Sequence, residues 1–214
     1  MKKLVIFDMD GTLADTSEGI FHCIRYTQKM MNLPEITHEQ MLSHVGPPME
    51  ESYARNFGLK GELLKRAIQF HKEYVMHKGY RELQVYEGIV DLLKAMRKNN
   101  IFTAVATLKA QTTANRIVEE YFPDLFDLIV GADAINPMTK AEMLINCIAY
   151  FSVPKSESVL IGDSIYDANG ALEAGIDFIA VTYGFGFKPN ESISINHLGI
   201  ADKPEDLVQI LLTK

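Results

Sequence analysis

Two aspartates stand one residue apart, directly after a short apolar run near the start of the chain. The run is Leu4–Phe7, written LVIF, and the acids are Asp8 and Asp10. Side chains alternate between the two faces of an extended strand, so both carboxylates would point to the same side and repel each other. The arrangement therefore suggests a chemical role that offsets the repulsion.

Two structural explanations of this acidic pair compete with a chemical one. A calcium loop of the EF-hand kind fits poorly, because Gly11 and Thr12 stand where that loop needs a variable residue and a third oxygen ligand. Asp10 or Asp15 could instead cap a turn or a helix. Capping would not exclude a catalytic use, so both explanations stay open at this point.

Three further groups with chemical potential fall at or just after predicted strand ends. They are Thr107 after one strand, Lys140 at the start of a helix, and the sequence GDSIYD at 162–167, which contains Asp163, Ser164 and Asp167. Ligands bind at the carboxyl ends of the strands in open α/β sheets. We therefore expect these groups to meet the acidic pair at that edge.

Each of these groups also has a structural explanation when it is taken alone. Thr107 could be a simple strand-end hydroxyl, and Asp163 or Ser164 could cap a helix that has Asp167 in its first turn. Lys140 could be a solvated lysine, although the positive N-terminal end of a helix disfavours a cation there. A lysine in that position is easier to explain if it faces carboxylates. The combination of all these features, in this order, favours one chemical site.

The elements that must position these groups are short apolar strands separated by helices. Runs rich in β-branched residues lie at 4–7, 101–107, 127–131, 158–162 and 177–181. Helical patterns with recognisable starts lie between them, for example after Gly88 and after Thr139. This alternation predicts an α/β fold with a mostly parallel sheet whose strands are buried on both faces.

One long stretch interrupts the alternation and shows only helical patterns. It predicts helices near 17–31, 38–43, 48–57 and 61–78, with a capping-box pattern at Thr37 and Gln40. A block of this length exceeds an ordinary crossover between two strands, so we interpret it as an inserted domain that could act as a lid. The predicted domains are an α/β core formed by 1–14 and 83–214 and a helical cap domain formed by 15–82.

Composition and charge narrow the classes of partner. The chain has 214 residues, 47% of them hydrophobic, and a net charge of −7, so its overall charge favours neither a nucleic-acid polymer nor an anionic membrane. Cys23 and Cys147 lie far apart, which favours reduced thiols over a disulfide or a zinc site. No segment approaches the ~20 apolar residues of a membrane span, and the run before Asp8 is too short for a signal peptide. We expect a cytoplasmic protein.

The order of the motifs resembles that of a known superfamily. DMDGTLADT, VATLK, Lys140 and IGDSIYDANGALEAG are similar to the four motifs of the haloacid dehalogenase superfamily, and the resemblance spans essentially the whole chain. VGPPMEES at 45–52 and VTYGFGF at 181–187 further resemble its branch of phosphoglycolate phosphatases and 5'-nucleotidase-like enzymes. The resemblance implies a Rossmann-like parallel-sheet core with an inserted α-helical cap domain.

The resemblance also implies a role for each motif residue. Asp8 would be the nucleophile that forms an aspartyl phosphate, and Asp10 would protonate the leaving oxygen and then deprotonate the attacking water. Mg²⁺ would be held by Asp8, Asp163 and the backbone carbonyl of Asp10. Phosphate would be bound by Thr107, Lys140 and the amides of Met9 and Asp10. Asp167, with Ser164 beside it, would orient Lys140 or a water on the metal.

The sequence departs from the family pattern at two positions. Leu108 follows the motif threonine, and Lys109 and Ala110 come next, where many relatives have Ser or Asn before Lys-Pro. A second polar contact at position 108 is therefore missing. Ala141 follows Lys140 where other branches have proline, which we expect to be neutral. Neither departure touches the predicted catalytic acids.

Two features favour one reaction within the superfamily. Asp10 argues against a dehalogenase, because that reaction has no leaving oxygen to protonate. The loop at 46–50 reads GPPME, without the lysine of a phosphonatase or the arginine usual in a β-phosphoglucomutase. We therefore expect hydrolysis of a small phosphomonoester of the phosphoglycolate or nucleoside monophosphate type. A pyrophosphatase or a β-phosphoglucomutase-type phosphotransferase is the alternative, and the full set of motif residues disfavours a binding module without turnover.

Substrate choice should depend on the cap domain, because the core would contact only the phosphoryl group and the metal. The candidate residues are His44, Gly46, Pro47 and Arg55, with Arg25 and Lys78 as further basic side chains. The GFGF stretch at 184–187 could flank the entrance or could serve as a turn. The predicted partner is a small phosphorylated metabolite.

Overall fold

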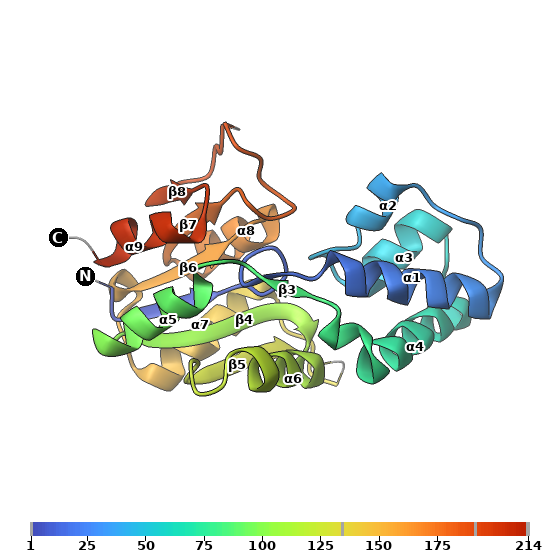
Figure 1. Ribbon diagram of the computed structural model, residues 1–214, viewed down its shortest axis with the longest axis horizontal. Coiled ribbons are helices and arrows are strands. Elements are labelled where there is room, and N and C mark those ends of the chain that lie inside the picture. The colour runs from blue at the N-terminus through green and yellow to red at the C-terminus, as the bar shows by residue number, and fades with distance from the viewer. Residues whose placement is uncertain (1, 134, 191, 213–214) are drawn as a thin grey trace. The chain divides into compact units, whose positions relative to one another are not determined.

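The computed structural model describes residues 2–133, 135–190 and 192–212. The chain forms two compact units. One unit consists of Met1–Ala14 and Val85–Lys214, and the other of Asp15–Gln84. The first contains the β-sheet and the second consists of helices (Figure 1).

A six-stranded sheet forms the centre of the first unit. Its strands lie in the order β5-β4-β1-β6-β7-β8, and every pair of neighbours is parallel. The bounds are β1 Leu4–Phe7, β4 Phe102–Ala110, β5 Leu128–Ala132, β6 Ser158–Gly162, β7 Asp177–Val181 and β8 Gly199–Ala201. The predicted α/β fold with a parallel sheet is confirmed, and β8 is a strand that the sequence patterns did not predict.

The central strand β1 is apolar throughout. All four residues of β1 are fully buried, as a strand in a doubly covered parallel sheet requires. Leu4 and Ile6 share one apolar cluster with Met143 and Leu144 of α7 and with Ala171 of α8. The helices of this unit are α5 Ile89–Lys98, α6 Gln111–Tyr121, α7 Lys140–Phe151, α8 Ile165–Ala174 and α9 Pro204–Leu212, with the 3-10 turn η2 at Lys155–Glu157.

The strand order creates a switch point beside β1. From β1 the chain adds β4 and β5 on one side, and it then returns to place β6, β7 and β8 on the other side. Ligand sites of doubly wound sheets lie at such a point, outside the carboxyl ends of the strands. Asp8 directly follows β1 and Asp163 directly follows β6, so the fold brings both acids to this position.

The helical unit has a small core of its own. Tyr53 is fully buried there, and its hydroxyl lies 3.0 Å from Nδ1 of His71 and donates to Oγ1 of Thr27 at 3.1 Å. The helices are α1 Ser17–Met31, α2 His38–Leu42, α3 Met49–Phe57 and α4 Gly61–His77, followed by the 3-10 turn η1 at Gly79–Arg81. The chain enters this unit through β2 Ala14–Asp15 and leaves it through β3 Gln84–Val85, and these two short strands pair with each other.

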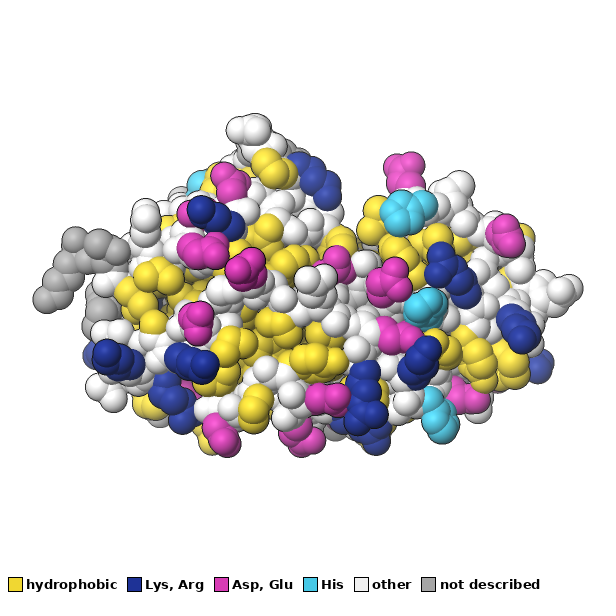
Figure 2. All heavy atoms as spheres, viewed as in Figure 1, with side chains coloured by type: hydrophobic (Ala, Val, Ile, Leu, Met, Phe, Trp, Pro, Cys, Tyr) yellow, Lys and Arg dark blue, Asp and Glu magenta, His cyan; other side chains and the backbone are white. Residues whose placement is uncertain are grey.

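The surface carries mixed charge. On the face shown in Figure 2, lysine and arginine side chains are interspersed with aspartate and glutamate. Among the described residues, no helix combines the length and the apolar character that crossing a lipid bilayer would require.

His44 is a buried titratable group within the helical unit. Its side chain is 6% exposed, and its ring packs edge-on against Tyr53 with 5.1 Å between ring centroids. Nε2 has no hydrogen-bond partner among the described residues. Burial, with a smaller contribution from the Arg55 charge, lowers the pKa of His44 from its usual value near 6.5 to about 4. The neutral imidazole is therefore the form that the fold accepts.

This pKa predicts a loss of stability in acid. Between about pH 6.5 and pH 4 the unfolded chain binds a proton at His44 that the folded chain does not bind, so the free energy of unfolding should fall as pH falls through this window. The fall due to His44 should be at most about 3 kcal/mol. Urea unfolding at a series of pH values should show a shallower fall for His44→Leu than for the unmodified chain. The exposed His77 provides the control, since His77→Leu should leave the slope unchanged; equal slopes for all three proteins would contradict the prediction.

Candidate active site

Asp8 is held at the carboxyl end of β1 by both its backbone and its side chain. Its backbone N–H donates to the carbonyl of Ile161 at 2.9 Å, which extends the pairing of β1 with β6 by one residue. Its carboxylate oxygen Oδ1 lies 2.6 Å from Nζ of Lys140. The residue is 7% exposed. Asp8 is thus a nearly buried carboxylate with one fixed cationic partner.

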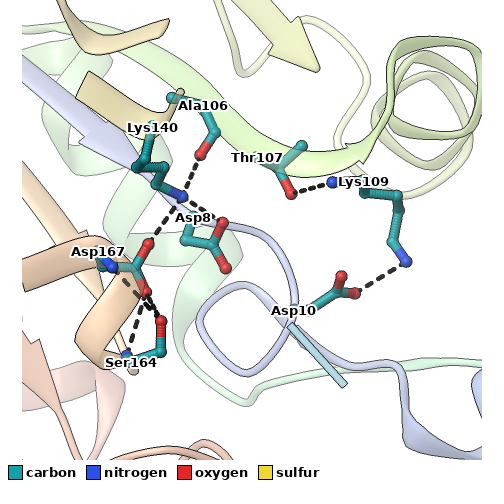
Figure 3. Close-up of polar contacts among 8 residues, drawn as sticks. All are labelled: Asp8, Asp10, Ala106, Thr107, Lys109, Lys140, Ser164 and Asp167. Atoms are coloured by element: carbon teal, nitrogen blue, oxygen red, sulfur yellow. Dashed lines mark hydrogen bonds and ion pairs between the residues drawn. The ribbon is translucent and has the colours of Figure 1, made fainter. Parts of the chain in front are cut away.

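The Lys140 ammonium group contacts three separate segments: the residue after β1, strand β4 and helix α8. Nζ donates to Oδ1 of Asp8 at 2.6 Å, to the carbonyl of Ala106 at 2.7 Å, and lies 2.7 Å from Oδ1 of Asp167 (Figure 3). An ammonium group has three donors, so these contacts use all of them. The lysine is the first residue of α7, whose start is fixed by a capping box between Thr139 and Glu142. The unfavourable position of a lysine at a helix start is offset by these two carboxylates.

Asp167 is oriented by the start of its own helix. Its Oδ2 accepts hydrogen bonds from the backbone N–H of Ser164 at 3.1 Å and from the Ser164 hydroxyl at 2.6 Å. Ser164 caps α8, and the two residues form a capping box. The second oxygen, Oδ1, is thereby turned toward Lys140 (Figure 3). Asp167 can therefore cap α8 and also contact Lys140, because each of these contacts uses a different carboxylate oxygen.

Asp163 is oriented by backbone groups of the segment that follows β7. Its Oδ2 accepts from the N–H of Phe185 at 2.7 Å and from the N–H of Gly186 at 3.0 Å. The residue is 4% exposed. Its carboxylate is therefore fixed by main-chain donors, whereas that of Asp8 is fixed by Lys140.

Asp8, Asp163 and Asp167 form one buried acidic group. Each offers a carboxylate oxygen, and these oxygens all lie within 4.8 Å of one another. Burial raises the pKa of Asp8 to about 8; Lys140 opposes this rise, whereas Asp167, Asp10 and Asp163 add to it. Burial and the charge of Asp167 likewise raise the pKa of Asp163 to about 7. The Lys140 pKa is raised, because Asp167 and Asp8 outweigh the opposing effect of burial.

The donor set of this group fits a divalent cation. With all three acids ionised and Lys140 protonated, the group has three negative charges and one positive charge, a balance of −2. Oxygen ligands of this kind are those that Mg²⁺ prefers. A divalent cation would therefore neutralise the group and favour the ionised form of each acid.

Asp10 lies outside this acidic group and has a cationic partner of its own. Its Oδ1 is 3.0 Å from Nζ of Lys109, and both side chains are largely buried (Figure 3). The N–H of Lys109 donates to Oγ1 of Thr107 at 3.2 Å, which fixes the hydroxyl of a residue that is 1% exposed. Met9, between the two acids, is fully buried, and its N–H donates to no group among the described residues.

The four candidate substrate residues belong to the helical unit. His44 is buried, whereas Arg55 is exposed and donates to the carbonyl of Ser43 at 2.6 Å and to Glu51 at 3.2 Å. Gly46 has a φ of +96° and, like Pro47, is partly exposed. This φ suits a glycine, and it marks a turn between α2 and α3.

Two contributors to the site were not predicted from the sequence. Lys109 was noted only within a departure from the family pattern, and the prediction that this departure does not touch the catalytic acids was wrong, because Nζ of Lys109 lies 3.0 Å from Oδ1 of Asp10. Its place two residues after Thr107 was the available signal. The amides of Phe185 and Gly186 lie in the GFGF stretch, whose repeated glycines were the only indication of close backbone contact.

Comparison with known proteins finds a family model and individual relatives that match this chain. A family model described as haloacid dehalogenase-like hydrolase matches residues 5–181. Tyrosine-protein kinase PtkA of Mycobacterium tuberculosis is 34% identical over 187 residues, which cover 86% of this chain; the match spans only 63% of that protein's length. A 5'-nucleotidase of Pseudomonas aeruginosa is 28% identical over 184 residues, covering 85% of this chain and 83% of that protein. Further relatives at 28% identity are named phosphoglycolate phosphatase.

A solved structure shows the same architecture over the whole chain. The crystal structure of a predicted phosphatase from Clostridium acetobutylicum matches with a TM-score of 0.91 at 29% sequence identity, and all of both chains is covered. The fold that the strand and helix patterns predicted is therefore shared with this protein.

Removal of the buried ammonium group should destabilise the fold. In Lys140→Met the carboxylates of Asp8 and Asp167 lose their counter-charge, so the free energy of unfolding near neutral pH should fall by about 3–5 kcal/mol. Adding Asp167→Asn to the same chain should recover part of the loss, because it removes one of the unpaired charges. Urea unfolding with a chelator present measures both changes. The exposed Lys155 supplies the control Lys155→Met, and a loss no larger than that of the control would contradict the prediction.

Proposed function

Because the chain belongs to the haloacid dehalogenase-like hydrolase family, as its motifs predicted, we propose that it is a Mg²⁺-dependent phosphatase of the cytoplasm. Its substrate is a small phosphomonoester of the phosphoglycolate or nucleoside monophosphate type. The observation that supports this most directly is the Lys140 ammonium group, which holds Asp8 at 2.6 Å and Asp167 at 2.7 Å beside Asp163. The names of the relatives, which include 5'-nucleotidase and phosphoglycolate phosphatase, support the substrate class.

Asp8 is the proposed nucleophile. One of its carboxylate oxygens forms a bond to phosphorus while the bond from phosphorus to the ester oxygen breaks, which leaves an aspartyl phosphate on Asp8. The contact with Lys140 limits rotation of the carboxylate, so the attacking group is oriented before substrate arrives. The hydroxyl of Thr107 and the unpaired N–H of Met9 are available as donors to the phosphoryl oxygens.

Asp10 is the proposed acid and base. It gives a proton to the leaving ester oxygen, and it then takes a proton from the water that attacks the aspartyl phosphate. Phosphate is released and Asp8 is restored. The ion pair with Lys109 fixes the position of the Asp10 carboxylate apart from the acidic group around Asp8.

The proposed metal ligands are Asp8, Asp163 and the backbone carbonyl of Asp10. Bound Mg²⁺ would supply positive charge next to the phosphoryl group and so stabilise the charge that develops during transfer. Asp167 belongs to the same acidic group, and its contacts to Lys140 and Ser164 support a positioning role.

The helical unit is the proposed cap, and its residues around the turn at Gly46 and Pro47 are the proposed specificity determinants. Arg55 is exposed and basic, which suits an anionic substrate. His44 is neutral near pH 7 and buried, so we propose that it shapes the turn and contributes no charge.

Two other reactions of the same core remain candidates. A pyrophosphatase or a mutase would use the same Asp8 chemistry, with a different acceptor or substrate. The kinase relative favours a third possibility, because its 34% identity is the highest among the relatives compared above. A transfer from ATP to tyrosine would require a different phosphoryl donor and a different acceptor.

Turnover should require both acids of the first motif. With a panel of phosphomonoesters and Mg²⁺, Asp8→Asn should lower kcat by at least about a thousandfold, because the amide is not a nucleophile. Asp10→Asn should lower it by about 100- to 10,000-fold, because proton transfer is lost. Phosphate release measures both effects. Asp91→Asn, at an exposed position of α5, is the matched control and should keep full activity.

Activity should also depend on the cation and on the kind of substrate. A chelator should abolish phosphate release, and added Mg²⁺ should restore it. Full activity of either acid variant, or turnover indifferent to the chelator, would overturn the mechanism. Isomerisation of a sugar phosphate without phosphate release would favour the mutase. Phosphate release from pyrophosphate alone would favour the pyrophosphatase. Transfer of labelled phosphate from ATP to tyrosine would favour the kinase.

A further inference from the structure

The segment after β7 touches both turns that carry the predicted metal ligands. We call residues 182–187, with the sequence TYGFGF, the brace loop. One turn follows β1 and contains Asp8 and Asp10, and the other follows β6 and contains Asp163. The proposed chemistry uses no side chain of the brace loop. The contacts that the loop makes with these two turns therefore have another role.

The brace loop holds Asp163 through three consecutive backbone amides. The N–H groups of Phe185 and Gly186 both donate to Oδ2, at 2.7 and 3.0 Å, and the N–H of Phe187 donates to the Asp163 carbonyl at 2.7 Å. Oδ1 of Asp163 accepts no hydrogen bond from any described residue. One oxygen is therefore saturated by the loop, and the other stays available to a cation.

The same loop holds the turn after β1 through a side chain. The hydroxyl of Tyr183 donates to the carbonyl of Thr12 at 3.0 Å. The Tyr183 ring packs edge-on against Tyr86, with 4.8 Å between ring centroids. Thr12 lies only two residues after Asp10, so this bond holds the turn that carries Asp8 and Asp10.

Between these anchors the loop backbone lies against both turns at once. A Cβ atom placed on Gly184 would stand 2.3 Å from the carbonyl oxygen of Gly11 and 2.5 Å from Oδ2 of Asp163. A Cβ on Gly11, whose φ is +78°, would stand 2.3 Å from the same Oδ2. Any side chain larger than hydrogen at position 184 would push Asp163 and the β1 turn apart.

We propose that the brace loop sets the affinity of this site for Mg²⁺, by fixing the Asp163 carboxylate against the turn that carries Asp8 and Asp10. The inference rests on the proposed function for the identity of the cation. The acids of this site repel one another, so without a support each would turn away when the cation leaves. Groups that orient metal ligands commonly change affinity by 10- to 100-fold when they are altered.

Calorimetric titration of Mg²⁺ into the full chain, without substrate, tests this proposal. Gly184→Ala should weaken Mg²⁺ binding by about 10- to 100-fold, because the added methyl group displaces Asp163. Tyr183→Phe should weaken it by about three- to tenfold, the effect of one hydrogen bond. Matched controls are Gly199→Ala, where the three atoms nearest to the new methyl group belong to the flexible Ile210 side chain, and Tyr150→Phe at a 66% exposed residue. Both controls should bind Mg²⁺ as the unmodified chain does.

The outcomes separate the brace loop from the proposed function. If Gly184→Ala fails to fold, Tyr183→Phe alone decides, with thermal unfolding as the check of its integrity. Unchanged affinity in folded loop variants, equal weakening in the controls, or no Mg²⁺ binding by the unmodified chain would overturn the proposal. If the loop variants bind more weakly and the unmodified chain binds Mg²⁺ but hydrolyses no ester, the brace loop is supported and the phosphatase is rejected. A working phosphatase whose loop variants bind Mg²⁺ normally rejects the brace loop alone.

Discussion

The crowding of Asp8, Asp163 and Asp167 around one ammonium group is the constraint on which the site depends. Three carboxylates within 4.8 Å repel strongly in a buried environment, and Lys140 neutralises only part of their charge. The surrounding structure keeps them together by giving each acid a fixed donor. Asp8 has Lys140, Asp167 has Ser164, and Asp163 has the amides of the brace loop. The three carboxylates are therefore held together by contacts that come from three separate segments of the chain.

The parallel sheet makes this concentration of acids possible. Every strand of the sheet runs in the same direction, so the residues after β1, β4 and β6 reach one edge without long loops. Lys140 reaches this edge from the start of α7 and also contacts β4 through the Ala106 carbonyl. Stability and reactivity are coupled here, because the lysine that neutralises two buried acids also orients the predicted nucleophile.

Elements with a strong local pattern could be predicted from the sequence. The helix predicted at 17–31 is observed as Ser17–Met31, and the strands at 158–162 and 177–181 are observed with the same bounds. β8 was missed because it has three residues, begins with glycine, and forms only through pairing with β7. Local composition carries little information about such a strand.

The part of the site that lies at strand ends and helix starts could be predicted from the sequence. The contact of Lys140 with carboxylates could be predicted because a cation is disfavoured at the N-terminal end of a helix. The Lys109–Asp10 pair did not follow, because β4 continues to Ala110, beyond the predicted end at 107, and its pairing with β5 shifts register after Ala106. After such an irregularity, side chains no longer alternate regularly between the two faces of the strand. The amide donors of the brace loop are backbone groups, which every residue type except proline would supply.

The place of β1 in the sheet has a consequence for how the chain assembles during synthesis. β1 is synthesised before its two neighbours, which begin at residues 102 and 158, so the pairs Leu4 with Phe102 and Leu4 with Ser158 cannot form until those strands have emerged from the ribosome. The helical unit, by contrast, lies within residues 15–84, so all of it has emerged before β4 is synthesised. We therefore expect that unit to form first on the growing chain, while the apolar segment LVIF stays exposed until β4 and β6 arrive. We therefore expect the apolar strand that directly precedes Asp8 to need protection from aggregation until both of its neighbours have been synthesised.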